Sequence, residues 1–424
     1  MNAENLLILV SVTLLLSYIS SLIYTKTKIP DLILLMGFGI IVGPVLHLID
    51  VELFIELAPL MSILALSIIL FEAGINLDLV TLFEYMGKSL VLSATSIISS
   101  IVLVGYVVNF ILPSEFTLLQ AMLLGAMIGG TSTVSVFGIL SGLGKTIPNL
   151  TTTRVLLTME SIVSDPFCII ASITIIRMVM LPSVSIWDSL KEIYIIFILS
   201  SILGIAMGLF WARVLNRLRG RPFTYMITLA FLLPTYIISE EFVGAGGGAL
   251  TALAFGLAIS NYKYIMDRLG VPSRIMIDKQ KLREFHEEIT FFIKSFFFVY
   301  IGLVVTLSLK TTFIGLGITL ILMAMRYILV DVLNLFINFT LEEKVLSQFV
   351  YASGLPAFVM SQLPLIFDPT GQFFVNASIY PDLCMPIVLG TVIYSAIVAP
   401  IGVRQALARN IKSKLADKSE VTAS

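Results

Sequence analysis

Two carboxylates lie inside a stretch that otherwise has the pattern of an apolar helix. Residues 154–177, RVLLTMESIVSDPFCIIASITIIR, contain Glu160 and Asp165. At about 100° per residue, Ser161 shares a helical face with Asp165, Ser164 lies beside them, and Glu160 is displaced around the helix. An ionisable group near a bilayer centre costs at least ~2.5 kcal/mol on insertion scales, so it faces a wet cavity or a partner charge. We therefore predict ion or proton chemistry at Asp165, with a buried structural ion pair as the alternative interpretation for either carboxylate.

Two other apolar stretches contain helix-breaking residues at mid-depth. In GAMIGGTSTVSVFG, residues 125–138, two glycines precede Thr131 and Ser132, and in ASGLPAFVMSQLP, residues 352–364, glycine and prolines interrupt the pattern. The freed carbonyls and the hydroxyls of an unwound segment can hold a cation, and a pair of such segments is typical of inverted-repeat transporters. Close helix packing is the alternative interpretation of the small residues. The pattern predicts two broken helices that meet at an ion site.

Three more charged residues fall within or near apolar stretches. Glu72 lies about one turn from the end of its stretch, where a carboxylate that reaches the interface is the alternative to a site residue. Arg326 is deep enough to require a carboxylate, and both Glu160 and the nearby Asp331 are candidates. Lys294 is expected to reach the interface or to stabilise helix ends.

The composition indicates the class of protein. Of the 424 residues, 58% are hydrophobic and 12% are charged, which is about half the charge of a soluble domain. The chain is therefore predicted to be a polytopic, all-α membrane protein. A net charge of -1 and the lack of Lys/Arg-rich runs argue against a nucleic-acid partner. The two cysteines form no motif and are expected to be buried free thiols. We predict a transporter without a cofactor, and not an enzyme.

Apolar stretches of about 20 residues, the length that crosses the hydrocarbon core, predict thirteen membrane spans. Twenty-one of the 26 Lys and Arg residues then fall on the cytoplasmic side if the N-terminus is outside and the C-terminus cytoplasmic, as the positive-inside rule requires. The predicted location is the cell membrane. The predicted spans are 5–24, 31–49, 56–75, 88–112, 116–142, 150–180, 188–214, 224–239, 244–261, 289–309, 313–338, 346–367 and 383–407.

The thirteen spans also predict a domain organisation. Residues 1–410 are predicted to form one transmembrane transport domain, in which spans 1–6 and 8–13 are inverted repeats and span 7 connects them. The broken, crossing helices are then spans 5 and 12. The charged connection 262–288 is expected to be a surface helix between two bundles, and residues 411–424 a short polar cytoplasmic tail.

These motifs together resemble the monovalent cation:proton antiporter superfamily, most closely the NhaP-like archaeal and bacterial Na+/H+ antiporters. The resemblance covers nearly the whole chain and rests on GFGIIVGP, LFEAGI, GGTSTVS, ESIVSDP, FFIKSFFFVYIGL and Arg326. It implies that Asp165 is the essential ion- and proton-binding carboxylate, that Ser161 is a ligand, and that Glu160 pairs with Arg326. It also implies that Glu72 contributes to the site and that the protein is a homodimer.

The chain departs from the family pattern at three places. Many relatives have Thr-Asp where this chain has Thr131 and Ser132, and Asn where it has Ser164. An arginine often found in the second broken span is replaced by residues around Ser353. The predicted ion- and proton-binding residues are therefore Asp165, Ser161, Glu72, Thr131, Ser132 and Ser164, and the predicted Na+ ligands among them are Asp165, Ser161, Thr131 and Glu72.

The predicted function is exchange of a monovalent cation for protons by alternating access. Na+ is favoured, with Li+ as a second substrate, and a single essential carboxylate indicates one-for-one, electroneutral exchange. The alternatives are K+/H+ antiport, a cation channel or non-transporting ion sensor on the same fold, and Na+-coupled symport of an organic solute. A channel is expected to show a continuous polar lining with repeated selectivity elements, which this sequence lacks.

Overall fold

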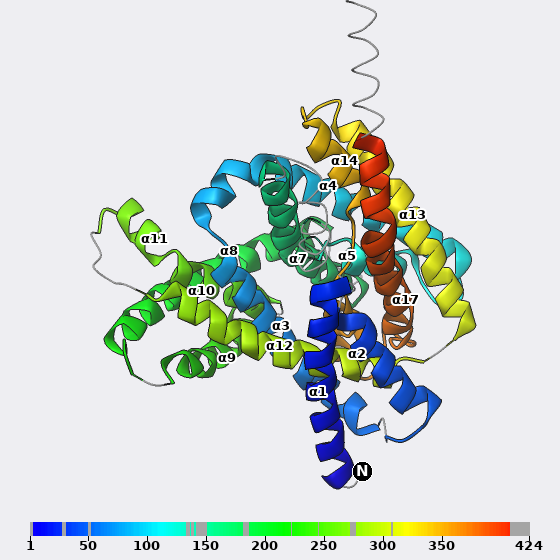
Figure 1. The fold of residues 1–424 in the computed structure, drawn as a ribbon, viewed down its shortest axis with the longest axis horizontal. Coiled ribbons are helices and arrows are strands. Elements are labelled where there is room, and N and C mark those ends of the chain that lie inside the picture. The colour runs from blue at the N-terminus through cyan, green and yellow to red at the C-terminus, as the bar shows by residue number, and fades with distance from the viewer. Residues whose placement is uncertain are drawn as a thin grey trace, which may run out of the picture.

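The computed structural model is all-helical in the residues that it describes (Figure 1). The predicted tail 411–424 and most of predicted span 5 beyond Ser132 lie outside the described residues. The described residues are 3–27, 31–49, 52–132, 136, 140, 151–180, 186–221, 223–244, 246–271, 277–306 and 308–407.

Every predicted span coincides with a helix or with a run of short helices. The elements, in chain order, are α1 (Ala3–Thr27), α2 (Asp31–Ile40) with the π-helical segment η1 (Ile41–Val45), α3 (Glu52–Asn76), α4 (Leu79–Ile111), α5 (Leu118–Ile128), α7 (Thr151–Met180), α8 (Ile186–Arg217), α9 (Thr224–Phe242), α10 (Gly247–Ser260), α11 (Tyr262–Arg268), α12 (Lys279–Val304), α13 (Leu309–Leu333), α14 (Leu341–Phe349), α15 (Leu355–Ser361), α16 (Leu363–Phe367), α17 (Ile379–Ile393) and the π-helical segment η2 (Tyr394–Val398).

Six helical stretches in the described residues are long and apolar enough to cross a membrane by length and composition. They are Leu7–Tyr24, Gly87–Ile111, Thr152–Met180, Tyr194–Arg217, Leu309–Leu333 and Ile379–Leu407. Shorter apolar helices, among them α2 with η1, α5 and α10, coincide with further predicted spans. Both segments predicted to be broken are among the short ones, because each loses its helical backbone within the apolar stretch.

The connection predicted as one surface helix is two separate elements. The short helix α11 ends at Arg268, and α12 begins at Lys279, ten residues before predicted span 10. The Asp278 side chain accepts a hydrogen bond from the Lys281 backbone N–H at 3.2 Å and so caps the start of α12. The prediction placed this start too late because hydropathy detects only the apolar part of a helix.

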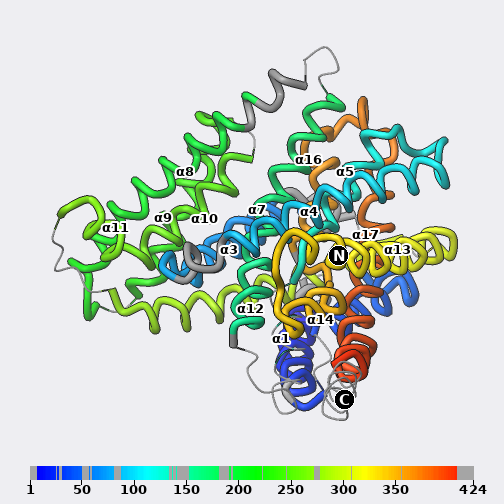
Figure 2. The backbone as a smooth tube through the Cα atoms, turned by 90° about the horizontal axis from the view of Figure 1, so that it is seen from above, coloured from blue at the N-terminus to red at the C-terminus, as the bar shows by residue number. Residues whose placement is uncertain are grey.

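The helices form two bundles with few contacts between them. In the first, α10 packs on α3, α8 and α9, and α12 packs on α1, α2 and α3. In the second, α4 packs on α5, α7 and α13, and α17 packs on α13 and α15. Figure 1 shows α8–α11 on one side and α13, α14 and α17 on the other, and Figure 2 shows the same separation from above. Each predicted repeat is divided after its third span, so that its first three spans lie in the first bundle and its last three in the second. The inverted-repeat relation itself stays a prediction.

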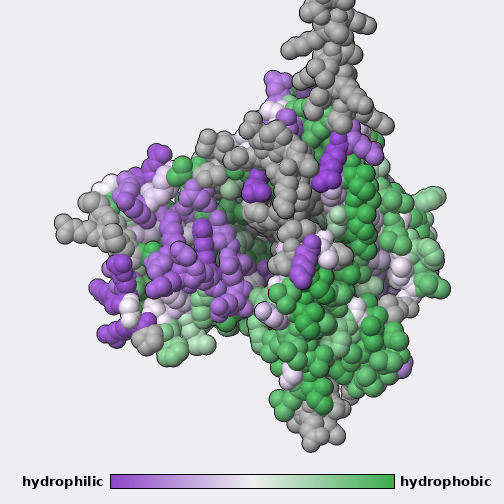
Figure 3. All heavy atoms as spheres, in the orientation of Figure 1, coloured by the Kyte–Doolittle hydropathy of each residue, from purple (hydrophilic) through white to green (hydrophobic). Residues whose placement is uncertain are grey.

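Large apolar side chains cover much of the outer surface. They include Leu15 on α1, Ile98 on α4, Ile202 on α8 and Leu320 on α13, all more than half exposed. In Figure 3 the hydrophobic residues form a broad surface over α1 and α17, whereas hydrophilic residues gather over the side that carries α10 and α11. Apolar surface of this extent fits contact with lipid and not with water.

Asp368 organises the turn between α16 and α17. Its carboxylate accepts hydrogen bonds from the backbone N–H groups of Gln372, Phe373 and Phe374 at 3.1, 2.7 and 2.8 Å. Burial alone would raise the pKa of Asp368, but these amides and the Thr370 hydroxyl together hold it below its usual value. The carboxylate therefore stabilises the fold above the ordinary Asp pKa, and this contribution is lost as the pH falls through the lower pKa of the folded state.

Asp368→Ala is expected to destabilise the protein by about 2 kcal/mol, because amides buried in this turn lose a charged acceptor. Thermal unfolding in detergent between pH 3 and pH 8 measures the effect. Below pH 4 the variant should also be destabilised less by acid than the parent is. Glu288→Gln, at an exposed position on α12, is the control. Equal unfolding temperatures for Asp368→Ala and the parent at pH 7 would contradict the assignment.

Candidate ion-binding site at the crossing of two interrupted helices

The two predicted breaks lie against each other in the second bundle. Helix α5 ends at Ile128, and the chain is not helical again through Ser132. Helix α14 ends at Phe349, and α15 begins only at Leu355. The Ser132 N–H donates to the Ala352 carbonyl at 2.6 Å, and a Cβ on Gly354 would lie 2.8 Å from the Ser132 Cβ. The extended segments therefore cross in direct contact.

Neutral groups satisfy the exposed backbone at this crossing. The carbonyl of Ile128, at the end of α5, accepts hydrogen bonds from the Ser353 hydroxyl at 2.8 Å and from the Tyr351 hydroxyl at 3.4 Å. The Ser353 N–H donates to the Thr391 hydroxyl at 3.1 Å. Hydroxyls thus take the positions where charged residues were expected from the family pattern, and the crossing is held without a charge of its own.

Asp165 lies beside this crossing on α7. A Cβ on Gly130 would be 3.3 Å from Asp165 Oδ1 and 3.2 Å from Cys168 Sγ, so a larger residue there would crowd the carboxylate. Asp165 is partly exposed, and no hydrogen bond joins its carboxylate to another residue within the described part of the chain. The proline at position 166 removes an N–H and leaves the Ile162 carbonyl without its helical donor. An unengaged carboxylate beside helix-end carbonyls favours a cation.

Ser161 and Ser164 connect α7 to the break. The Ser161 hydroxyl donates to the Thr131 carbonyl at 2.9 Å, and the Ser164 hydroxyl accepts from the Thr131 N–H at 3.1 Å. The structure therefore brings together four of the predicted Na+ and proton residues, namely Asp165, Ser161, Ser164 and Thr131, and places Ser132 at the crossing next to them. Both serine hydroxyls also hold the unwound backbone in position, a second role that the sequence did not indicate.

Glu72 has a different neighbour. Its carboxylate lies 3.5 Å from Lys294 Nζ on α12, and both side chains are partly exposed. Lys294 is also close enough to Asp165 to interact with it electrostatically. Glu72 and Asp165 thus share Lys294 as a neighbour, and no direct contact of Glu72 with the crossing is seen in the described residues. Among the described residues no group of three or more His, Cys, Asp or Glu side chains converges on a metal position.

The buried arginine pairs with the carboxylate of α7. Arg326 Nη1 lies 2.7 Å from Glu160 Oε1, and Arg326 Nη2 lies 2.8 Å from Glu160 Oε2. Both side chains are at most 2% exposed. The alternative partner, Asp331, instead lies 2.7 Å from Lys344 on α14. This buried pair leaves Asp165 as the carboxylate of α7 without a salt-bridge partner among the described residues.

The comparisons with known proteins now decide the family. A family model described as sodium/hydrogen exchanger, transmembrane, matches residues 11–409. The chain belongs to this exchanger family. The Na(+)/H(+) antiporter ApNhaP of Aphanothece halophytica is 29% identical over 306 residues, 71% of this chain and 54% of that protein. The K(+)/H(+) antiporter NhaP of Alkalimonas amylolytica is 25% identical over 263 residues, 58% of this chain and 42% of that protein.

The fold is similar to that of a solved structure. The sodium proton antiporter MjNhaP1 from Methanocaldococcus jannaschii at pH 8 superimposes with a TM-score of 0.80 and 19% identity, covering 96% of this chain and 100% of that chain. At this identity the likeness shows the fold alone. The chain spans about half the length of the first curated relatives that it matches.

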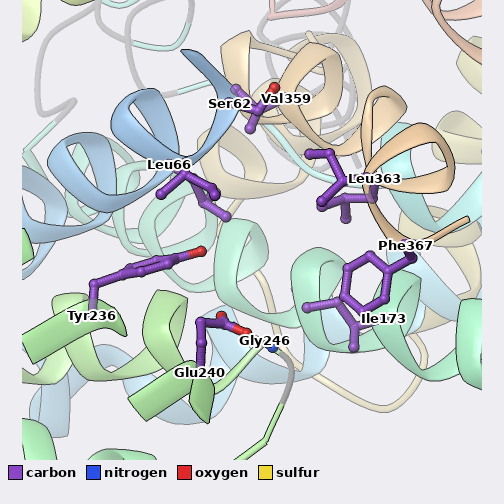
Figure 4. Close-up of a pocket in the computed structure, with 11 residues that line it drawn as sticks. Ser62, Leu66, Ile173, Tyr236, Glu240, Gly246, Val359, Leu363 and Phe367 are labelled. Atoms are coloured by element: carbon purple, nitrogen blue, oxygen red, sulfur yellow. Dashed lines mark hydrogen bonds between the residues drawn. The ribbon is translucent and has the colours of Figure 1, made fainter. Parts of the chain in front are cut away.

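A cavity of about 400 Å3 lies between parts of the two bundles (Figure 4). Leu66 of α3 and Tyr236 of α9 line one side, and Ile173 of α7 and Leu363 of α16 line the other. Ile173 lies about two turns along α7 from Asp165. The Glu240 carboxylate, also in the wall, accepts hydrogen bonds from backbone N–H groups at the start of α10 at 2.8–3.1 Å. Glu240 therefore caps α10, and the cavity lies at the interface between the bundles.

The sequence analysis missed a line of serines on α4. Ser89, Ser93, Ser96 and Ser100 are all at most 1% exposed. Ser96 accepts a hydrogen bond from Arg326 at 2.5 Å, and the hydroxyls of Ser93 and Ser100 donate to backbone carbonyls of α7 and α5. Their spacing of four, three and four residues places them on one helical face. From that spacing, the sequence could have predicted the polar face of α4 that packs against the site.

Gly130→Ala is expected to weaken cation binding by about tenfold, about 1.4 kcal/mol, because the new Cβ meets Asp165 Oδ1 and Cys168 Sγ at 3.2–3.3 Å. The cation concentration for half-maximal proton movement measures the effect in reconstituted vesicles. Gly317→Ala on α13 is the matched control, since a Cβ there meets nothing within 4 Å. An unchanged half-saturating concentration in Gly130→Ala would place the cation elsewhere.

Proposed function

We propose that this exchanger moves a monovalent cation across the membrane in exchange for protons, with Na+ as the favoured cation. The observation that supports the proposal best is the Asp165 carboxylate, which faces Gly130 at the crossing of the interrupted helices with no hydrogen-bond partner in the described residues. A carboxylate in this position can hold either a proton or a cation. Competition between the two at one site produces exchange, because each species displaces the other.

The charge at the site supports a one-for-one stoichiometry. Glu160 is neutralised by Arg326, and Glu72 lies next to Lys294, so Asp165 is the carboxylate at the crossing that binds either the exchanged proton or the cation. One proton released for one cation bound leaves the loaded site with the same charge. Electroneutral exchange predicts a rate that is independent of an imposed membrane potential.

The bundle architecture supports alternating access. The site lies in the second bundle, and the cavity separates part of this bundle from α3 and α9 of the first. A rigid-body shift of one bundle against the other would expose Asp165 to each side of the membrane in turn. Moving an unpaired negative charge through the membrane interior is costly, so only loaded states would cross.

The chemistry of the ligand atoms favours Na+ as the transported cation. Thr131 and Ser161 offer oxygens beside a single carboxylate, and carbonyl and hydroxyl oxygens can complete a Na+ shell without added charge. K+/H+ antiport is the second candidate, because Ser132 is neutral where many relatives carry a carboxylate and fewer anionic ligands penalise dehydration of small cations more. Relatives named as Na+/H+ and as K+/H+ antiporters both match this chain.

The direct test is proton movement in proteoliposomes that contain a pH-sensitive dye. Na+ and Li+ added to vesicles with an acidic interior are expected to raise the internal pH, while choline has no effect. A response to K+ and never to Na+ would replace the favoured cation. Cation currents without proton movement would indicate a channel, and cation binding without flux would indicate a sensor.

Ser132→Asp is expected to lower the Na+ concentration for half-maximal exchange by about tenfold, through a second anionic ligand at the crossing. Like-charge repulsion with Asp165 should also move the pH optimum upward, because one carboxylate then holds its proton to higher pH. The same proteoliposome assay from pH 6 to pH 9 measures both effects, with the isosteric Ser132→Cys as the neutral control. A weaker Na+ response at every pH would argue against a cation ligand at this position.

Topology and assembly complete the proposal. The distribution of Lys and Arg residues supports an outside N-terminus and a cytoplasmic C-terminus in the cell membrane. Labelling of single cysteines from each side of the membrane would test this orientation. The homodimer rests on the family resemblance, and the mass of the protein in lipid nanodiscs tests it.

A further inference from the structure

One face of α12 carries polar residues through the interface with α3. Arg283, His286, Thr290 and Lys294 follow at spacings of three, four and four residues, which places them within about 80° on one helical face over about 16 Å. Three of them reach α3. Arg283 Nη2 donates to the Ile75 carbonyl at 3.2 Å, the His286 ring meets the Phe71 ring edge-on at 4.8 Å, and Lys294 lies 3.5 Å from Glu72.

Four polar atoms along this stripe have no hydrogen-bond partner in the described protein. They are Arg283 Nε, both ring nitrogens of His286 and the hydroxyl oxygen of Thr290, and all are buried. His286 is 0% exposed and Thr290 is 1% exposed. A buried donor or acceptor without a partner costs about 1–3 kcal/mol, so native interiors satisfy such groups with protein or with ordered water. Four unsatisfied atoms along one stripe indicate that the same kind of partner satisfies each of them.

Water fits the chemistry of all four atoms. A neutral imidazole needs one donor and one acceptor, a guanidinium Nε–H needs an acceptor, and a hydroxyl accepts either kind of partner. One water molecule can donate two hydrogen bonds and accept two, and buried waters typically make about three. Successive waters at this spacing can bond to each other as well as to the side chains.

We propose that Arg283, His286 and Thr290 hold a file of water molecules that carries protons between the Arg283 end of α12 and the Glu72–Lys294 pair. The proposal rests on proton exchange as the proposed function. At each step a water passes one proton to its neighbour and receives another from behind, and the Glu72 carboxylate accepts the last. Because Lys294 interacts electrostatically with both Glu72 and Asp165, protonation of Glu72 changes the charge balance at Asp165.

The direct test needs no transport measurement. A structure of the full-length protein in lipid nanodiscs, at a resolution that shows water, is expected to contain waters within about 3.2 Å of Thr290 Oγ1 and of a His286 ring nitrogen. A stripe without water overturns the proposal, whether or not the protein exchanges ions. Exchange absent in the parent protein, with water present, would overturn the proposed function and with it the proton route.

The kinetic test uses Thr290→Val, which removes the hydroxyl and keeps the shape. The maximal rate of cation-driven proton movement is expected to fall about tenfold, while the half-saturating cation concentration stays within about twofold. His286→Phe should act in the same direction, and Thr290→Val decides the matter if His286→Phe does not fold. Ser295→Ala is the matched control on α12, because the Ser295 hydroxyl donates to the carbonyl of Phe291 in its own helix at 2.7 Å. An unchanged maximal rate in a folded Thr290→Val protein would overturn the route.

Discussion

Asp165→Asn is expected to abolish cation-dependent proton movement while the protein remains folded in the membrane. The amide occupies the same space beside Gly130, but it can neither release a proton nor balance the charge of a bound cation. Everted vesicles or proteoliposomes loaded with a pH-sensitive dye measure the loss on addition of Na+, Li+ or K+. The expected rate is that of vesicles without the protein.

The matched control for this variant is Asp331→Asn. Asp331 is also a carboxylate in the second bundle, but it is 43% exposed and lies next to Lys344, so its variant should retain parental exchange. Persistent exchange in Asp165→Asn, with a normal unfolding temperature, would remove Asp165 from the site. Glu72 would then be the next candidate, and Glu72→Gln the next variant.

Neutralising one member of the Glu160–Arg326 pair is expected to destabilise the protein by about 3–5 kcal/mol, because it leaves the other charge buried without a partner. In Glu160→Gln the guanidinium keeps only the Ser347 carbonyl at 2.7 Å and the Ser96 hydroxyl at 2.5 Å among its described hydrogen bonds. Thermal unfolding of the purified protein in one detergent, with and without lipid, measures the loss.

Two further variants test whether the pair itself carries the effect. The exchanged double variant, Glu160→Arg with Arg326→Glu, should recover part of the lost stability. Lys344→Gln breaks the exposed pair with Asp331 and should cost less than about 1 kcal/mol. Equal unfolding temperatures for Arg326→Ala and the parent would show that the buried pair does not stabilise the fold.

Local patterns along the chain were sufficient to predict the spans and the breaks. Stretches of apolar residues and the charge asymmetry of the loops predicted all-α architecture and thirteen spans, and each span coincides with helical structure. Gly129 and Gly130 before hydroxyls, and the prolines after Gly354, marked both interruptions. Such features are readable because helix propensity, helix length and the cost of burying a charge depend on neighbouring residues alone.

Contacts between distant segments were decided only by the tertiary structure. The sequence left Arg326 with two possible carboxylates, and packing of α13 against α4 and α14 near α7 selects Glu160 and leaves Asp331 to Lys344. Packing of α12 on α3 places Glu72 next to Lys294, and packing of α4 on α5 and α7 sets the serines of α4 against those two helices. Periodicity assigns a residue to a face of its own helix, but which helix covers that face depends on the whole arrangement of the bundles. For this reason the sequence by itself determined that Asp165 needs a polar partner or an ion, and the fold determined that it faces an unwound backbone held by hydroxyls.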